Sequence, residues 1–120
     1  MKSALAAVLA ATSINALAAI AVVDDAGRPV TLARPAQRVI SLAPHVTELL
    51  FAAGGGARVV GAVNYSDYPA AAKKLPLVGS FNKIDVESVL ALKPDLLVVW
   101  QSGNPARQLE QLSQLRIPVY

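Results

Sequence analysis

Between Arg38 and Tyr120, short runs of consecutive apolar residues alternate with segments whose apolar residues recur at helical spacing. Strands are predicted over residues 39–42, 59–63 and 96–100, with a further strand beginning at 119–120. Helices are predicted between them, starting near Pro44, Asp85 and Pro105. Strands that alternate with helices form a parallel sheet covered on both faces. The sequence therefore predicts an α/β domain with a parallel sheet flanked by helices.

The sequence also predicts helix ends and smaller elements between these strands and helices. Gly54, Gly55 and Gly56 are predicted to end the first helix, because glycine readily adopts the left-handed conformation found at helix C-termini. Asp85 is predicted to cap the second helix. One helical turn is expected at residues 70–74 and a minor strand at 77–78.

Two β-prone runs precede the alternation, at either end of residues 21–32. The turn-rich stretch at 25–28 between them predicts a short β-hairpin. Pro35 marks a linker that ends at Gln37. Residues 19–37 are therefore expected to form a hairpin and linker, and residues 38–120 an incomplete α/β lobe.

The first 18 residues have the pattern of a signal peptide. Lys2 provides a positive start, residues 4–11 are apolar, and Ala16 and Ala18 provide the small residues of a cleavage site. The alternative is a buried N-terminal helix. The signal peptide predicts export to the periplasm. Because the chain ends inside its last predicted strand, it is also expected to be a piece of a longer protein.

Composition argues against several classes of site. The chain contains no cysteine, which leaves no disulfide framework or cysteine-ligated metal site, and no metal site is predicted. The net charge is +3, but the basic residues are scattered and only Lys73 and Lys74 are adjacent. A nucleic-acid-binding protein would normally gather its basic residues on one surface, so a nucleic-acid partner is not expected.

The predicted strand ends carry most of the aromatic residues. Ligands of open parallel sheets bind outside the carboxyl ends of the strands. His45 follows the first strand, Tyr65 and Tyr68 follow the second, Phe81 precedes the second helix, and Trp100 ends the third strand. Such rings offer wide, rigid surface to a large planar ligand. The alternative is that Phe81 and Trp100 close the domain edge and that His45 is an ordinary hydrogen-bonded residue.

Enzymatic activity is not predicted. The chain has one histidine and no cysteine, and its serines lack the context of a nucleophile elbow. Gly54, Gly55 and Gly56 follow a predicted helix rather than a strand, and neither a dinucleotide fingerprint nor a P-loop lysine is present.

Three segments together resemble the periplasmic cobalamin-binding proteins, within the wider class that binds iron siderophores, haem and cobalamin. They are VISLAPHVTELL (39–50), GAVNYSDYP (61–69) and ESVLALKPDLLVVWQSGN (87–104). The resemblance implies a Rossmann-like N-terminal lobe of a two-lobe periplasmic binding protein that holds its ligand between the lobes. It also implies a monomer that delivers cobalamin to an ABC permease and ATPase complex at the inner membrane.

The resemblance also implies roles for individual residues. Tyr65 is similar to a tyrosine that contacts the corrin ligand, Phe81 stands where a tryptophan lines the cleft, and Trp100 lies on the same wall. His45 and Tyr68 are further candidate ligand contacts. Glu87 matches a glutamate that docks onto arginines of the permease. Without the resemblance, Glu87 would be read as a solvated helix charge.

Two alternatives remain open at this stage. The ligand could be haem or a ferric siderophore, with His45 or Tyr65 as the iron ligand. A Rossmann-like nucleotide-dependent enzyme is the other alternative, which the missing phosphate fingerprint disfavours.

Overall fold

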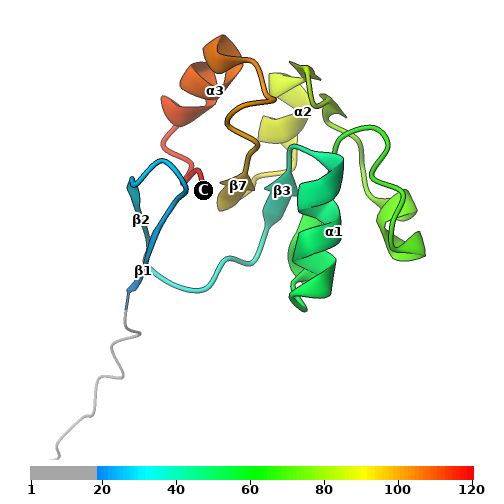
Figure 1. Ribbon diagram of the computed structural model, residues 1–120, viewed down its shortest axis with the longest axis horizontal. Helices are drawn as coiled ribbons and strands as arrows, with labels where there is room; N and C mark the ends of the chain where they lie inside the picture. Colours follow the sequence, from blue (N-terminus) through cyan, green and yellow to red (C-terminus); the bar gives the residue numbers. More distant parts are fainter. Residues whose placement is uncertain (1–18) are drawn as a thin grey trace, which may run out of the picture.

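The computed structural model of the chain describes residues 19–120 (Figure 1), so the predicted signal peptide at residues 1–18 lies outside the described residues. The strands are β1 (Ile20–Val23), β2 (Pro29–Leu32), β3 (Val39–Ser41), β4 (Val59–Gly61), β5 (Gly79–Ser80), β6 (Lys83–Ile84) and β7 (Leu96–Val98). The helices are α1 (Pro44–Ala52), α2 (Val86–Ala91) and α3 (Ala106–Ser113), with short 3₁₀ turns η1 (Gly56–Arg58) and η2 (Ala70–Lys74). Within residues 19–120, no helix is long and apolar enough to cross a membrane.

The central sheet is parallel, as predicted. Its order is β4-β3-β7, and both pairings of β3 are parallel. Single parallel bridges extend it on either side, from Ala62 to Leu77 and from Leu97 to Val119. The predicted strand at 77–78 is thus reduced to one bridge. The α/β fold class is confirmed.

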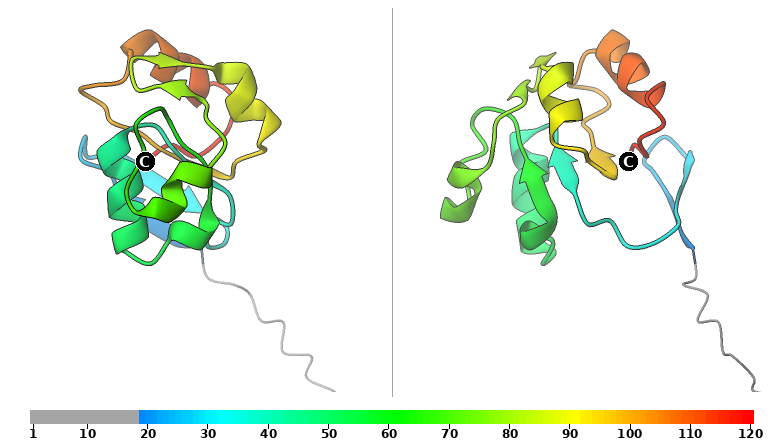
Figure 2. Two further views of the ribbon diagram at one scale, coloured as in Figure 1. Left: turned by 90° about the vertical axis from the view of Figure 1, so that its right-hand side faces the viewer. Right: turned by 180° about the vertical axis from the view of Figure 1, so that it is seen from behind.

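Helices cover both faces of this sheet. The chain crosses from β3 to β4 through α1 and returns past β3 to β7 through α2. Because crossovers between parallel strands are right-handed, opposite directions of travel put α1 and α2 on opposite faces. Figures 1 and 2 show α2 and α3 together, with α1 apart from them. Val89 of α2 and Leu112 of α3 share one buried cluster with Ile40 and Leu97 of the sheet.

The end of α1 corrects part of the glycine prediction. Gly54 has φ +86° and its N–H donates to the Phe51 carbonyl at 3.1 Å, while the Gly55 N–H donates to the Leu50 carbonyl at 2.8 Å. These two bonds form a Schellman motif, so Gly54 and Gly55 do end the helix. Gly56 does not, because it begins η1, where a Cβ would overlap the Phe51 ring.

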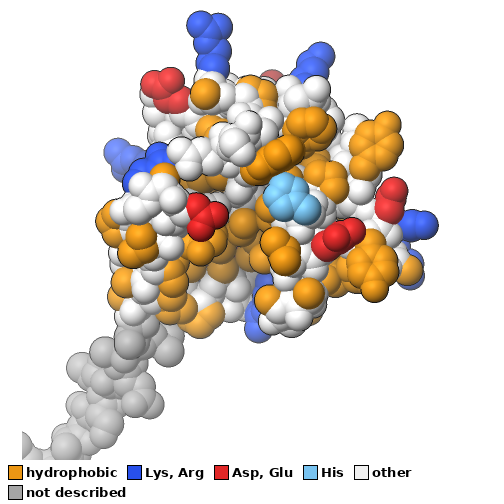
Figure 3. Space-filling view, viewed as in Figure 1, with side chains coloured by type: hydrophobic (Ala, Val, Ile, Leu, Met, Phe, Trp, Pro, Cys, Tyr) orange, Lys and Arg blue, Asp and Glu red, His pale blue; other side chains and the backbone are white. Residues whose placement is uncertain are grey.

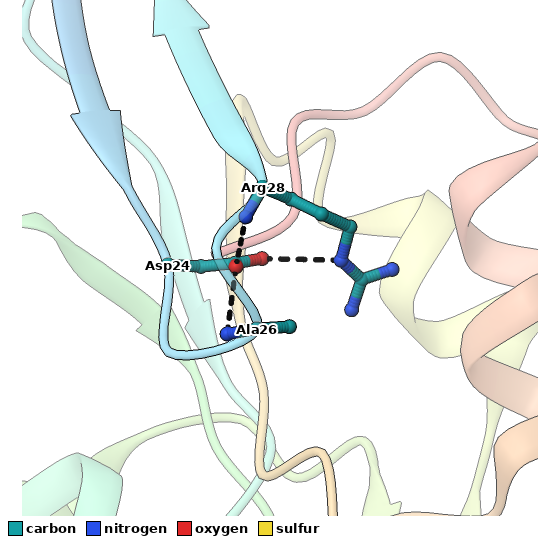
Figure 4. A network of polar contacts seen from close by, with 3 residues as sticks. All are labelled: Asp24, Ala26 and Arg28. Atoms are coloured by element: carbon teal, nitrogen blue, oxygen red, sulfur yellow. Dashed lines mark hydrogen bonds and ion pairs between the residues drawn. The ribbon is translucent and has the colours of Figure 1, made fainter.

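The predicted N-terminal hairpin is present. β1 and β2 pair antiparallel, and the Asp24 carboxylate closes the turn. It accepts hydrogen bonds from the N–H groups of Ala26 (2.9 Å) and Arg28 (2.8 Å) and pairs with the Arg28 guanidinium at 3.5 Å (Figure 4). Aspartate is favoured in turns because its side chain bonds nearby backbone in this way. Beside the hairpin, Val30 of β2 and residues 116–119 line an open groove.

Asp95 and Arg38 join the linker to the amino ends of the strands. The Asp95 carboxylate accepts hydrogen bonds from the backbone N–H groups of Gln37 and Arg38, both at 2.8 Å. The Arg38 guanidinium donates to the Leu92 carbonyl at 2.9 and 2.7 Å, and so satisfies a carbonyl at the end of α2. Both interactions are charge-assisted and fix the start of β3.

The hairpin of β5 and β6 was not predicted. Its strands have two residues each, too few to show an alternating pattern. Gly79 makes the close approach possible, because it has φ +102° and a Cβ there would overlap the backbone of residues 83–85. β7 is also shorter than predicted and ends at Val98, and two residues later the Trp100 N–H bonds to the Asn104 side chain instead of a strand.

Candidate ligand-binding edge

The loops that follow β3 and β7 diverge at the carboxyl edge of the sheet. These strands are neighbours, but the chain leaves β3 for α1 on one face and leaves β7 for α3 on the other. Such a divergence opens a crevice where ligands of α/β sheets bind. His45, in the first turn of α1, meets Trp100, which follows β7. Their ring centroids are 5.0 Å apart and their planes are at 87°.

Phe81 joins this pair from the turn between β5 and β6. Its ring centroid lies 5.6 Å from that of Trp100, with the planes tilted by 45°. We call His45, Phe81 and Trp100 the aromatic wall. Phe81 and Trp100 are 36% and 37% exposed, so both residues are partly open to solvent. Figure 3 shows the single histidine among hydrophobic side chains on this face.

The two predicted tyrosines do not join the wall. Tyr65 and Tyr68 lie in the loop after β4, 81% and 69% exposed. Among residues 19–120, neither ring packs against another aromatic ring. Tyr65 has φ +66°, a left-handed conformation that is costly for a residue with a bulky side chain. It therefore needs support from its neighbours.

The residue next to Tyr65 belongs to a buried cluster of hydroxyl groups, which was not predicted. The Thr47 hydroxyl lies 2.8 Å from that of Ser41 and 3.0 Å from that of Ser66. A hydroxyl can donate once and accept twice. The Ser41 hydroxyl donates to the Ala43 carbonyl at 3.0 Å, so it accepts from Thr47, which in turn accepts from Ser66. They tie β3, α1 and the loop next to Tyr65 together. Their only signal in the sequence is that polar residues interrupt otherwise apolar segments.

Asn104 is a second buried polar residue that was not predicted. It is 5% exposed, and its amide bonds to three segments. Its Oδ1 accepts from the Trp100 N–H at 2.7 Å, and its Nδ2 donates to the carbonyls of Leu42 (2.9 Å) and Phe81 (2.7 Å). In the sequence, Asn104 looks like an ordinary residue of a turn.

Glu87 lies in the first turn of α2, and it is exposed. It lines an open groove of about 590 Å³, together with Lys83 and Asp85. Asp85 caps α2 as predicted, accepting from the Ser88 N–H at 3.2 Å. The pKa of Asp85 is lowered, chiefly by the hydrogen bond from the Ser88 hydroxyl at 2.7 Å.

The wall can hold a flat organic molecule through stacking and apolar contact, without covalent chemistry. Among residues 19–120, no three or more histidine, aspartate or glutamate side chains are grouped to hold a metal ion.

Residues 39–120 match the family of periplasmic binding proteins, and the chain belongs to this family. The vitamin B12-binding protein of Yersinia pestis (strain Pestoides F) is 54% identical over 88 residues, which cover 73% of this chain and 31% of that protein. The predicted resemblance is therefore confirmed. The chain spans about a third of the length of the curated relatives that it matches.

Solved structures place the chain in the same group. The periplasmic vitamin B12 binding protein BtuF of Vibrio cholerae is 49% identical with a TM-score of 0.69, over 72% of this chain and 34% of that one. A periplasmic haem-binding protein from Pseudomonas aeruginosa is 35% identical with a TM-score of 0.66, over 71% of this chain and 30% of that one.

Proposed function

We propose that this chain forms one side of the ligand site of a solute-binding protein that captures cobalamin in the periplasm for an ABC importer. The observation that carries the proposal is the aromatic wall, open to solvent at the point where the loops after β3 and β7 diverge. The sequence identity of the chain with vitamin B12-binding proteins, 54% and 49% for two relatives, favours cobalamin as the ligand. The role is non-catalytic.

The chemistry of the wall suits a corrin ring. A corrin is broad and nearly flat, so the rings of Phe81 and Trp100 can cover its apolar surface at a small cost in conformational entropy. Tyr65, exposed after β4 on the same edge of the sheet, supplies another ring, and Tyr68 extends the same loop. Loss of one central aromatic anchor typically weakens binding by about 2 kcal/mol.

Trp100 provides a direct test, because it is the only tryptophan in the chain. We expect cyanocobalamin to quench its fluorescence saturably and to bind more tightly than hemin. Because Trp100→Ala removes the reporter, its affinity should be measured by calorimetry, with a loss of about tenfold or more expected. Leu49→Ala is the matched control, since Leu49 is a 64% exposed apolar residue of α1 outside the wall. Saturable binding that Trp100→Ala leaves unchanged would contradict the proposal.

Haem is the second candidate ligand. The exposed ring of His45 stands against the Trp100 ring at the wall, and imidazole is a common axial ligand of haem iron. The haem-binding protein of P. aeruginosa is also 35% identical. If hemin binds more tightly than cyanocobalamin, and its Soret shift is lost in His45→Ala, haem replaces cobalamin as the ligand.

A further inference from the structure

We propose that Asn104 is a positioning residue that sets the geometry of the aromatic wall before any ligand arrives. The proposal rests on the proposed function only where ligand affinity is concerned. Its basis is that one buried amide bonds the three segments that carry His45, Phe81 and Trp100.

The hydrogen bonds of Asn104 use all the polar groups of its side chain. The amide has one acceptor oxygen and two N–H donors. The oxygen accepts from the Trp100 N–H, and the nitrogen donates to the Leu42 and Phe81 carbonyls, at 2.7 to 2.9 Å. An aspartate of the same shape has no donor for the two carbonyls, and a leucine has no polar group at all. An asparagine therefore fits this position for a specific chemical reason.

Each bonded backbone group lies in a segment that leads to or carries one ring of the wall. Phe81 and Trp100 are bonded at their own backbone, and Leu42 is the residue that leads from β3 into the turn before His45. The hairpin that carries Phe81 has strands of only two residues, and such short hairpins are marginal on their own. Among residues 19–120, the Asn104 amide supplies the hydrogen bond that joins the Phe81 backbone to the rest of the edge. The amide thus supplies order that the strands do not.

Order in the free protein matters for binding. Side chains that are already held in place lose less entropy when the ligand binds, which raises affinity. Burial of Asn104 also excludes water from the amide. Removal of the amide would therefore leave the Leu42 and Phe81 carbonyls and the Trp100 N–H without their partner. We therefore expect changes at Asn104 to disorder the wall more than they alter the sheet.

Ligand-free spectroscopy of the 120-residue chain tests this directly. We expect Asn104→Asp and Asn104→Leu to lower the fluorescence anisotropy of Trp100 and to weaken its near-ultraviolet circular dichroism, while the far-ultraviolet spectrum stays unchanged. Trp100 signals equal to those of the wild type would overturn the proposal.

Gln108 offers a matched control, because its amide also bridges backbone groups. It accepts from the Ile84 N–H at 2.9 Å and donates to the Ile84 carbonyl at 2.8 Å, so it anchors β6 of the hairpin that carries Phe81 without bonding to a residue of the wall. Gln108→Leu should lower the melting temperature and leave the Trp100 signals unchanged. If Gln108→Leu alters them as much as Asn104→Leu does, the role of Asn104 is general stability and the proposal fails.

A measurement on the wild type covers the case in which the Asn104 variants do not fold. The side-chain amide protons of Asn104 should exchange with solvent far more slowly than those of Asn64, which is exposed. Equal exchange rates would show that the amide is not held in these bonds and would overturn the proposal.

The last measurement is the affinity for the ligand. Asn104→Asp should bind cyanocobalamin about tenfold or more weakly than the wild type. If the wild type binds cyanocobalamin and Asn104→Asp binds it equally well, the proposal fails. If the wild type does not bind it at all, the proposed function fails, whereas the ligand-free spectra still decide the role of Asn104.

Discussion

The indole of Trp100 lies where the side chain of residue 103 would be. A Cβ built on Gly103 would overlap three carbon atoms of the indole ring, whereas its backbone φ is outside the left-handed region. Alanine could therefore adopt the backbone conformation of residue 103. At this position glycine provides space rather than flexibility, and that space lets the indole turn towards His45 and Phe81.

We expect Gly103→Ala to displace the Trp100 indole without unfolding the chain. The indole should move towards solvent, so the Trp100 emission maximum should shift to longer wavelength and cyanocobalamin affinity should fall several-fold. Fluorescence and calorimetry measure these effects. Ser102→Ala is the control, because Ser102 is exposed in the same loop. Wild-type emission in Gly103→Ala would show that the indole does not need this space.

α2 is short and depends on its first turn. It has six residues, too few to be stable as an isolated helix. The Asp85 carboxylate accepts hydrogen bonds from the N–H and the hydroxyl of Ser88, and these bonds lower its pKa below the ordinary value of 3.8. The bonds favour the ionised form in the folded state. The cap therefore stabilises the fold above pH 3.8, and this contribution is lost as the pH falls through the lowered folded-state pKa.

We expect Asp85→Ala to lower the urea midpoint of unfolding at pH 7, because α2 loses its N-terminal cap. The difference from the wild type should shrink in acid, where the wild-type carboxyl becomes protonated. Denaturation curves at pH 7 and at pH values below 3.8 provide the measurement. Asp85→Asn is the control, since asparagine also caps helices and has no charge to lose. A midpoint difference independent of pH would contradict the assigned cause of the lowered pKa.

At the scale of the whole molecule, the two edges of the sheet carry different features. The amino ends of the strands are joined to the linker through Arg38 and Asp95. The carboxyl ends carry the aromatic wall, and the parallel arrangement brings the start of α2 with Glu87 to the same edge. An exposed carboxylate at the edge that carries the ligand site can fix the register of a docking partner through charge-assisted hydrogen bonds. We propose that Glu87 docks on the permease.

We expect Glu87→Gln to weaken docking of the cobalamin-loaded protein on its reconstituted permease by about fivefold, with cobalamin affinity unchanged. The effect should diminish at high salt, because salt screens exposed charges. Binding to permease in nanodiscs at two salt concentrations measures both. Glu110→Gln, in the middle of α3, is the control. If both variants dock like the wild type, Glu87 is an ordinary solvated charge.

Local signals in the sequence predicted the order of the main strands and helices. The apolar runs and helical spacings predicted the sheet and its helices, because the periodicity of side chains reports directly on strands and helices. Gly54 predicted the end of α1 and Asp85 predicted the start of α2, since capping involves residues only a few positions apart. The hairpin turn at Asp24 is local in the same sense.

The tertiary structure alone decided which rings meet. The sequence predicted that His45, Tyr65, Tyr68, Phe81 and Trp100 share an edge, but only packing separates the two exposed tyrosines from the wall formed by the other three. The amide of Asn104 bonds to residues 62 and 23 positions away in the chain. Contacts over such separations leave no periodic pattern, because they exist only after the sheet has brought the strand ends together.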